Sequence, residues 1–285
     1  MTTERRIGDT SVFPVGLGAM PLSVAGHPDA AGARALVHAA LDAGVTLIDT
    51  ADAYSPDGVL GHNERIVADG LRTYGSDTAH VLVATKGGHT RDGDDWGLDG
   101  RPEYLRKACE ASLQTLGVDS IDLYQHHRPD PKVPYADTMG GLADLLEAGL
   151  VQRVGISNAD PDQIRVARDI IGDGLVSVQN QLSPAFQSSL PELDLCTELD
   201  LAFLPWSPLG GIGPATDLGS SHAAFGQVGQ RYGVSPQQVC LAWLLSMSPV
   251  CIPIPGASRP RSIQDSAAAT GLTLDADDIA VLSAA

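Results

Sequence analysis

The sequence has little basic charge, few cysteines and no long apolar run. It holds 18 lysines and arginines against 35 aspartates and glutamates, a formal net charge of −17. Such an excess of negative charge repels a phosphate backbone, so we expect no nucleic-acid partner. No apolar run approaches the roughly 20 residues that cross a bilayer, and no apolar stretch follows Arg5 and Arg6 as in a secretory leader. We therefore expect a cytoplasmic protein with no membrane partner.

The four cysteines, Cys109, Cys196, Cys240 and Cys251, lie far apart in the chain. They form no CxxC pair, and no histidine is spaced around them as in a metal site. Buried free thiols are expected here, with neither a disulfide nor a bound metal.

Short, mostly apolar segments rich in β-branched residues alternate with longer helical patterns along the whole chain. The predicted strands span residues 15–19, 45–49, 81–85, 121–125, 151–156, 176–179, 202–205 and 250–254. Strands that are apolar on both faces are typical of a parallel sheet covered by helices. Between the strands, Asp29, Asp160 and Ser235 are placed to cap helices, and the predicted helices 101–116 and 134–148 each end at a glycine.

Eight strand–helix repeats in 285 residues predict an α/β fold, a single (β/α)8 TIM barrel in one domain spanning residues 1–285. A doubly wound sheet is the structural alternative, but no GxGxxG turn follows the first strand. Residues 5–15, with Gly8 and Asp9 in the middle, predict an N-terminal β-hairpin before the barrel. Residues 275–285 predict a short C-terminal helix.

Ionisable side chains follow three successive predicted strands. Asp49 and Tyr54 follow the second strand, Lys86 the third and His127 the fourth. Each has an ordinary structural explanation, as a cap, a solvated charge or a packed histidine. Together they suggest catalysis, because a phenol needs charged neighbours to move a proton near neutral pH. An adjacent ammonium lowers the pKa of a phenol, and a carboxylate can orient that ammonium.

These segments resemble the conserved motifs of the aldo-keto reductases. The resemblance is carried by Asp49-Thr50-Ala51-Asp52-Ala53-Tyr54, by Thr85-Lys86 and by the run from Asp122 to His127. It implies a (β/α)8 barrel that reduces an aldehyde or ketone by hydride transfer from NADPH. In this family Tyr54 would be the general acid/base, Lys86 its pKa partner, Asp49 the orienting acid and His127 the residue that positions the carbonyl. The neighbouring His126 would point the other way and be packed.

The resemblance also implies a coenzyme site at the ends of the later strands. Ser157, Asn158 and Gln179 would bind the nicotinamide carboxamide, and Trp206 would stack on the ring. The pair Ser157-Asn158 could instead cap the helix after Pro161. The remaining expected coenzyme residues are Gly18, Met20, Asp49, Ser207, Leu209, Gly210, Gly256, Ser258, Arg259, Arg261 and Asp265.

Two arginines near a helix N-terminus stand out in so acidic a protein. Arg259 and Arg261 resemble the family's pocket for the adenosine 2′-phosphate, which favours NADPH over NADH. Many relatives carry a Glu–Asn pair a few residues later, where this chain has Asp265 and Ser266. NADH therefore stays open as a coenzyme.

We expect this protein to lack the long C-terminal loop that covers the substrate in larger members of the family. Residues 87–100, which contain Trp96, and residues 210–221 are the candidate lids, and the first segment could equally be flexible surface. Arg128 could bind an anionic group on the substrate, but pairing with Asp130 is the preferred interpretation. Short bacterial relatives with a similar layout include reductases of pyridoxal and other aldehydes and the aldose dehydrogenases. The partner is thus a small carbonyl or alcohol, and the oligomeric state is open.

Three other functions compete with this interpretation. A barrel lysine such as Lys86 could form a Schiff base in an aldolase. A protein of this family could also bind the nucleotide as a regulatory subunit, without significant turnover. A zinc-dependent barrel hydrolase is the weakest alternative, because the first strand has no HxH pair.

Overall fold

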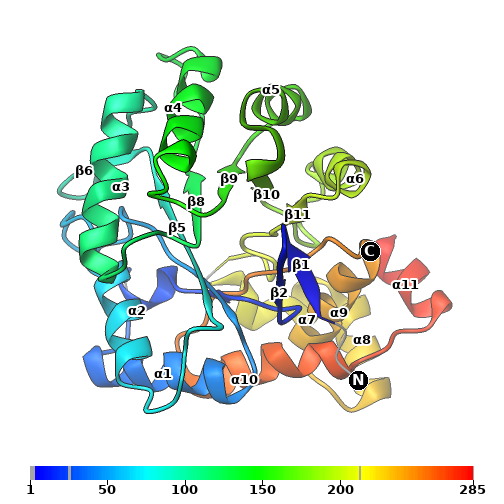
Figure 1. Cartoon of the computed structure of the whole chain (residues 1–285). Helices are drawn as coiled ribbons and strands as arrows, with labels where there is room; N and C mark the ends of the chain where they lie inside the picture. Colours follow the sequence, from blue (N-terminus) through cyan, green and yellow to red (C-terminus); the bar gives the residue numbers. More distant parts are fainter. Residues whose placement is uncertain (1–3, 25–26, 212, 285) are drawn as a thin grey trace.

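A computed structural model describes residues 4–24, 27–211 and 213–284. Its centre is a parallel sheet curled into a barrel (Figure 1). The neighbours along the sheet run β11-β10-β9-β8-β5-β4-β3. The strands are β3 (Leu17–Gly18), β4 (Leu47–Asp49), β5 (Leu82–Gly87), β8 (Leu123–His126), β9 (Val154–Ser157), β10 (Leu175–Gln179) and β11 (Ala202–Phe203).

An eighth extended segment, residues 251–256, closes the barrel between β11 and β3. On one side Ile252 N donates to Phe203 O at 2.8 Å, and on the other Gly18 N donates to Pro255 O at 3.0 Å. Proline has no N–H but can accept, so Pro255 fits the side of the segment that receives a hydrogen bond. The predicted (β/α)8 barrel is confirmed, and the doubly wound alternative is wrong, because an open sheet would leave β3 and β11 as edges.

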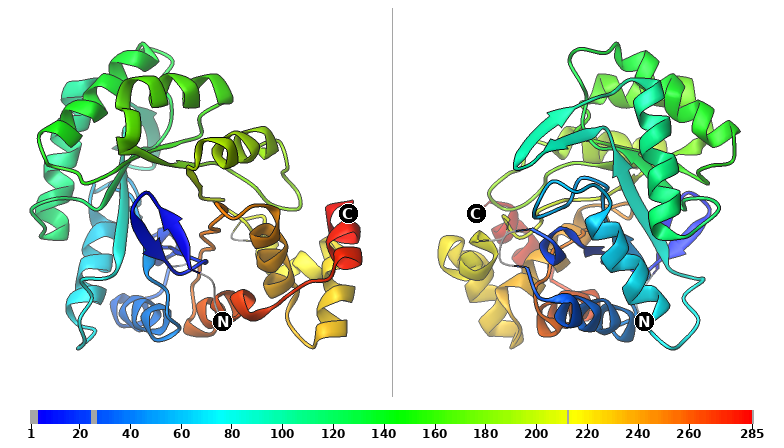
Figure 2. Two further views of the ribbon diagram at one scale, coloured as in Figure 1. Left: turned by 45° about the vertical axis from the view of Figure 1, so that its right-hand side comes forward. Right: turned by 90° about the vertical axis from the view of Figure 1, so that its left-hand side faces the viewer.

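Helices form the outer layer around the strands (Figure 1, Figure 2). As predicted, the side chains of Asp29, Asp160 and Ser235 accept hydrogen bonds at helix N-termini. The helices α2, α6 and α8 were not predicted, and none of them has a side-chain cap that would mark its start. The full set is α1 (Ala30–Asp42), α2 (His62–Arg72), α3 (Pro102–Leu116), α4 (Tyr135–Glu147), α5 (Pro161–Ile171), α6 (Leu190–Leu199), α7 (Leu218–Ser221), α8 (Ala223–Tyr232), α9 (Pro236–Met247), α10 (Pro260–Ala268) and α11 (Ala276–Ser283).

The N-terminal hairpin covers one end of the barrel (Figure 2). Its strands β1 (Arg5–Ile7) and β2 (Thr10–Val12) are antiparallel, and Ile7 and Val12 pack against apolar side chains of the barrel interior such as Leu47. Side chains alternate along each strand, so Leu47 points inward, Ile48 outward to the helices and Asp49 inward again. The interior is therefore apolar at the hairpin end and polar at the opposite end, where the site lies.

The segment after β5 is more regular than the sequence suggested. Residues 87–100 were expected to be a flexible loop or a lid, but they contain the antiparallel pair β6 (His89–Asp92) and β7 (Asp95–Leu98). The Arg91 guanidinium stacks over Trp96 at 4.2 Å and donates to the carbonyl oxygen of Ala53 at 2.9 Å. The hairpin is thus anchored to the loop after β4.

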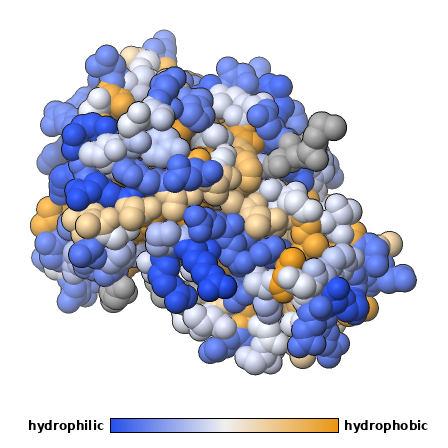
Figure 3. Space-filling view, turned by 90° about the horizontal axis from the view of Figure 1, so that it is seen from below, coloured by the Kyte–Doolittle hydropathy of each residue, from blue (hydrophilic) through white to orange (hydrophobic). Residues whose placement is uncertain are grey.

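The face of the molecule seen from below is mostly hydrophilic. Hydrophilic side chains predominate on it, and the strongly hydrophobic ones are scattered (Figure 3). Within the described part of the chain, every helix is too short or too polar to span a membrane. The four cysteines are buried and unpaired, as expected.

Candidate active site

Strand β4, the loop that follows it and strand β5 bring a buried acid, phenol and ammonium into direct contact. Lys86 is 0% exposed, and its Nζ donates to Asp49 Oδ1 at 2.5 Å, to the carbonyl oxygen of Thr50 at 2.8 Å and to Tyr54 Oη at 3.2 Å. Three acceptors therefore satisfy all three donors of the ammonium. The predicted cluster is thus assembled from Asp49 and Lys86, which point inward from adjacent strands, and from Tyr54 on the loop after β4.

The charges of this cluster depend on burial as well as on contact. Burial disfavours the charged form of Lys86, but Asp49 and Tyr54 together outweigh it, and the pKa of Lys86 lies above its ordinary value. Burial also raises the pKa of Tyr54, and the opposing effect of Lys86 is smaller. From the nearby ammonium, a lowered pKa was predicted for Tyr54. Lys86 does act to lower this pKa, but burial raises it by more.

His127 lies beside Tyr54 on the inner side of the site. The two rings meet edge to face at 5.5 Å, and His89 of β6 meets His127 in the same way at 4.4 Å. Burial, and then the nearby Lys86, hold the pKa of His127 well below its ordinary value, so the ring is neutral. Its buried Nδ1 has no partner in the described structure. A proton on Nδ1 would be a buried donor without an acceptor, so we expect the proton on Nε2.

His126 points away from the site, as the alternation of a strand requires. It is fully buried, its ring lies 6.2 Å from that of Tyr135 on α4, and burial lowers its pKa to about 4. Among the two adjacent histidines, only His127 can therefore reach the cluster.

The second carboxylate oxygen of Asp49 receives two side-chain amides. Gln179 Nε2 donates to Asp49 Oδ2 at 2.8 Å, and Gln125 Nε2 donates to the same oxygen at 3.1 Å. Gln179 was a predicted site residue, whereas Gln125 was missed. The only signal for Gln125 was an inward position on β8, two residues before His127.

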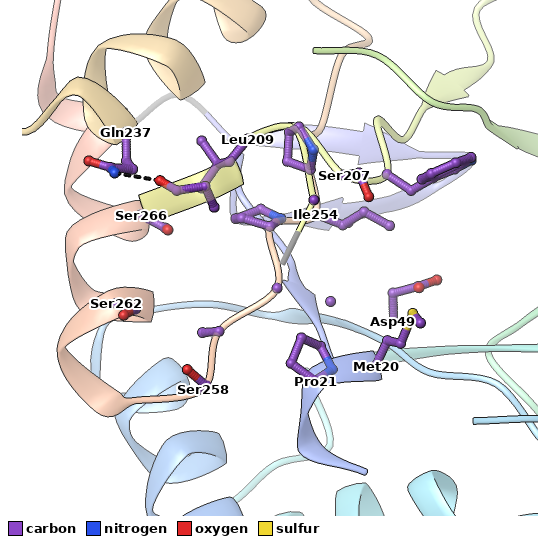
Figure 4. A pocket seen from close by; sticks show the side chains of 18 of the residues that line it. Met20, Pro21, Asp49, Ser207, Leu209, Gln237, Ile254, Ser258, Ser262 and Ser266 are labelled. Atoms are coloured by element: carbon purple, nitrogen blue, oxygen red, sulfur yellow. Dashed lines mark hydrogen bonds between the residues drawn. The ribbon is translucent and has the colours of Figure 1, made fainter. Parts of the chain in front are cut away.

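One elongated cavity of about 770 Å³ connects nearly all the predicted site residues. In Figure 4, Asp49 and Met20 lie at one end and the serines of α10 at the other, with Leu209 and Ile254 between them. Lys86 is buried behind Tyr54, and Gly210 lies beside the cavity, which its neighbour Gly211 lines. The predicted residues that line it are Gly18, Met20, Asp49, Tyr54, Trp96, His127, Arg128, Ser157, Asn158, Gln179, Trp206, Ser207, Leu209, Gly256, Ser258, Arg259, Arg261 and Asp265.

Ser157 and Asn158 line the cavity and do not cap a helix. Helix α5 is capped by Asp160, whose side chain and that of Gln163 form a capping box. Ser157 Oγ donates to the carbonyl oxygen of Gln179 at 2.7 Å, while Asn158 Nδ2 donates to the carbonyl oxygen of His127 at 3.0 Å. Asn158 has a φ of 57°, a left-handed conformation that asparagine tolerates better than most residues. The capping alternative is therefore wrong.

The far end of the cavity is built by the eighth segment and α10. A Cβ on Gly18 would lie 2.7 Å from the carbonyl oxygen of Ile254, so close packing of the barrel seam already requires this glycine. Arg259 and Arg261 are exposed beside the N-terminus of α10, and neither forms an ion pair within residues 4–24, 27–211 and 213–284. Asp265 accepts from Ser235 Oγ and from a glutamine of α9, both at 2.6 Å.

At the opposite end of the cavity, the predicted contact of Arg128 was wrong. It was expected to pair with Asp130, but its Nη2 donates to Asn158 Oδ1 at 3.3 Å. Asp130 instead accepts from the backbone of Gly100 and Lys132. Arg128 is thus an exposed cation at the cavity wall, in contact with a neutral amide.

Several other residues of the cavity wall were not predicted from the sequence. Gln237 of α9 donates to the carbonyl oxygen of Ala215 at 2.7 Å and so ties α9 to the 210–221 segment. Helical spacing could have identified Ser262 and Ser266, which lie one turn apart on α10 (Figure 4). The other lining residues that were not predicted as site residues are Pro21, Ala215, Thr216, Ser235, Ile254, Pro255 and Ala257.

The chain matches known proteins over its whole length. The sequence profile of the Aldo/keto reductase family matches residues 14–285. The chain is 35% identical over 294 residues to a 6-dehydroglucose reductase of Novosphingobium aromaticivorans, covering 99% of this chain and 95% of that protein. It is 32% identical over 282 residues to an uncharacterized oxidoreductase of Schizosaccharomyces pombe, covering 97% and 88%. Among solved structures, a glycerol dehydrogenase from Gluconobacter oxydans superposes with a TM-score of 0.84 at 26% identity, covering 99% and 94%. The chain belongs to the aldo/keto reductase family of oxidoreductases.

Proposed function

We propose that this protein is an NADPH-dependent carbonyl reductase, built as one barrel domain, in which Tyr54 is the general acid and, in reverse, the general base. The observation that carries the proposal is the contact of Tyr54 Oη with the Lys86–Asp49 ion pair at the wall of the elongated cavity. A coenzyme bound along this cavity would supply the hydride. The residues of the chain position both reactants and move the proton.

The proton chemistry follows from the state of each side chain. Tyr54 is protonated at neutral pH, because an ordinary phenol has a pKa near 10 and burial raises the pKa of Tyr54 further, so it can donate to the oxygen of a carbonyl. The Lys86 ammonium at 3.2 Å then stabilises the phenolate that this transfer leaves. The neutral His127, with its proton on Nε2, donates a second hydrogen bond to the same oxygen and fixes its direction.

The residues at the strand ends fit a nicotinamide. Ser157, Asn158 and Gln179 offer hydroxyl and amide groups to its carboxamide, and Trp206 offers a ring for stacking. Gln179 directs Nε2 to Asp49, which leaves its Oε1 as the acceptor for an amide N–H. Gly211, with a φ of 111°, gives a turn whose backbone amides can approach the pyrophosphate.

The two arginines at α10 determine the coenzyme preference in this proposal. Replacing both Arg259 and Arg261 with alanine should raise the Kd of NADPH by roughly tenfold or more, since charge-assisted hydrogen bonds to the 2′-phosphate are lost. The Kd of NADH should change less than about twofold. Titrations monitored by tryptophan fluorescence measure both values, with the exposed Arg165→Ala on α5 as control. Equal losses for the two coenzymes would refute the 2′-phosphate assignment.

At the substrate end we propose that Arg128 and Trp96 contact the part of the molecule beyond the carbonyl. Two relatives are named for glycerol and for 6-dehydroglucose, which favours oxygen-rich substrates. Arg128→Ala should lower kcat/KM for glyceraldehyde and its 3-phosphate by about tenfold, the loss of one hydrogen bond, while propanal is affected less than about twofold. Steady-state assays with these three aldehydes decide it. An equal loss of kcat/KM for all three aldehydes would show that Arg128 supports the structure of the site and does not contact the substrate.

The geometry favours hydride transfer over the Schiff-base alternative. An imine-forming lysine must be neutral, but Lys86 has a raised pKa and three acceptors around Nζ. A screen of coenzyme oxidation over sugars, pyridoxal, and aliphatic, aromatic and keto compounds tests the proposal. Tight NADPH binding with no turnover on the entire panel would instead support a regulatory nucleotide-binding role.

A further inference from the structure

Gln125 is a buried polar residue in contact with Asp49 and Gln179, yet it has no part in the proton transfer described above. It is 0% exposed and points into the barrel from β8. Its Nε2 donates to Asp49 Oδ2 at 3.1 Å, and Gln179 Nε2 lies 3.4 Å from its Oε1. Both polar atoms of this amide therefore face site residues on other strands.

The neighbouring strand leaves space for this side chain. A Cβ on Gly155 of β9 would lie 2.8 Å from Gln125 Cγ and closer still to Ser177 Oγ. Real side chains essentially never pack so closely, so any larger residue at position 155 would displace the Gln125 amide. The chain thus builds a polar side chain into a barrel interior where Leu123, two residues earlier on the same strand, is apolar.

We propose that Gln125 is a positioning residue, which holds the Asp49 carboxylate and the Gln179 amide in the orientations that the reaction needs. With Oδ1 bound to Lys86 and Oδ2 bound by two amides, Asp49 cannot rotate away from the ammonium. Gln179 Nε2 donates to both Asp49 and Gln125, so its Oε1 is free to accept a hydrogen bond from a group in the cavity. The proposal rests on the function proposed above, because it assigns Gln125 a part in that reaction.

The electrostatic consequence concerns Tyr54. The charged or titratable groups that face its phenol are Lys86, Asp49, Asp52 and His127. The side chain of Asp52 is buried without a hydrogen-bond partner among the described residues, and burial and the nearby Glu64 raise its pKa well above the ordinary range. His127 is neutral, because burial and Lys86 hold its pKa well below the ordinary value. After burial, Lys86 and Asp49 have the largest effects on the pKa of Tyr54, and Asp49 opposes phenolate formation.

The Gln125 amide dipole offsets part of the Asp49 charge. Without it, the negative charge acts more fully on Tyr54, and the pKa of the phenol rises further. The base form needed for alcohol oxidation then becomes scarcer at a given pH. A residue that served packing alone would not change this titration.

The test compares Gln125→Met, which keeps the volume and removes the amide, with Ser177→Ala. Ser177 is equally buried beside Gly155, but its Oγ has no hydrogen-bond partner in the described structure. In coenzyme-free protein with ¹³Cζ-labelled tyrosine, the NMR titration of Tyr54, assigned with Tyr54→Phe, should move up by about half to one pH unit in the Gln125 variant alone. The acid limb of the pH profile for alcohol oxidation should move by the same amount, which lowers oxidation below that limb roughly three- to tenfold.

Two results would overturn the proposal. The first is an unchanged Tyr54 titration in a folded Gln125→Met protein. The second is an equal shift in Ser177→Ala, which would show a general effect of altering the interior. The NMR titration needs no turnover, so it remains informative even if the wild-type protein reduces no carbonyl in the screen. A missing activity would then contradict the proposed function, and an unmoved titration would contradict the role of Gln125.

Discussion

Tyr54→Phe is expected to lower kcat for carbonyl reduction by about 10²- to 10⁴-fold, the range that a positioned general acid contributes. The variant loses only the phenol oxygen. Lys86 keeps two of its three acceptors, Asp49 Oδ1 and the carbonyl oxygen of Thr50, so the ion pair stays in place. The fold should therefore lose no more than about 1 kcal/mol, the net value of one hydrogen bond. Coenzyme affinity should stay within about twofold of the wild-type value.

Steady-state kinetics, coenzyme titration and thermal unfolding measure these three quantities. The matched control is Tyr124→Phe, since Tyr124 is fully buried on β8 but its phenol reaches the carbonyl oxygen of Leu105 outside the barrel. This control should keep kcat within about twofold. If Tyr54→Phe lost coenzyme binding in proportion to kcat, the phenol would not be the proton donor.

Lys86→Met is expected to cause the second large loss, in stability as well as activity. Removing the ammonium leaves the Asp49 carboxylate buried without its partner, which costs about 3–5 kcal/mol in similar cases. The pKa of Tyr54 should rise further, because Lys86 is the main group that lowers it. Oxidation of an alcohol, which needs the phenolate, should therefore lose more activity at neutral pH than reduction of an aldehyde.

A double-mutant cycle with Asp49→Asn separates the two effects. The pair Lys86→Met and Asp49→Asn removes both buried charges, so the double variant should unfold with a smaller loss of free energy than the sum of the single losses. Denaturant unfolding of the four proteins measures the coupling. Strict additivity would contradict the buried ion pair, and recovery of activity in the double variant would contradict a direct role of Lys86 at Tyr54.

Sequence patterns predicted the parts of this molecule that depend on order along the chain. Short strands alternating with helices indicated the barrel, and the ends of three successive strands indicated Asp49, Lys86 and His127. Parallel strands carry these positions to one end of the barrel, so the contacts between them follow from the fold. Strand alternation also separated His127, at the site, from His126, which packs against α4.

Contacts across the barrel could not be predicted in the same way. The hydrogen bond from Gln125 to Asp49 joins residues 76 positions apart, and no local pattern distinguishes a glutamine that points inward from one that packs elsewhere. Arg128 was assigned to Asp130 because the two are close in sequence, but the fold brings Asn158 nearer. The raised pKa of Tyr54 depends on burial, which appears only once all the layers are assembled.

Transfer of deuterium from the coenzyme to the substrate tests the central claim most directly. The protein is incubated with an aldehyde and NADPH that carries deuterium at either position of the nicotinamide C4, and the alcohol is analysed by NMR and mass spectrometry. We expect one of the two labelled coenzymes to place a single deuterium on the carbinol carbon, and borohydride to trap no substrate on Lys86. Alcohol without label from both coenzymes, or a borohydride-stable adduct at Lys86, would contradict a reductase in which Tyr54 donates the proton.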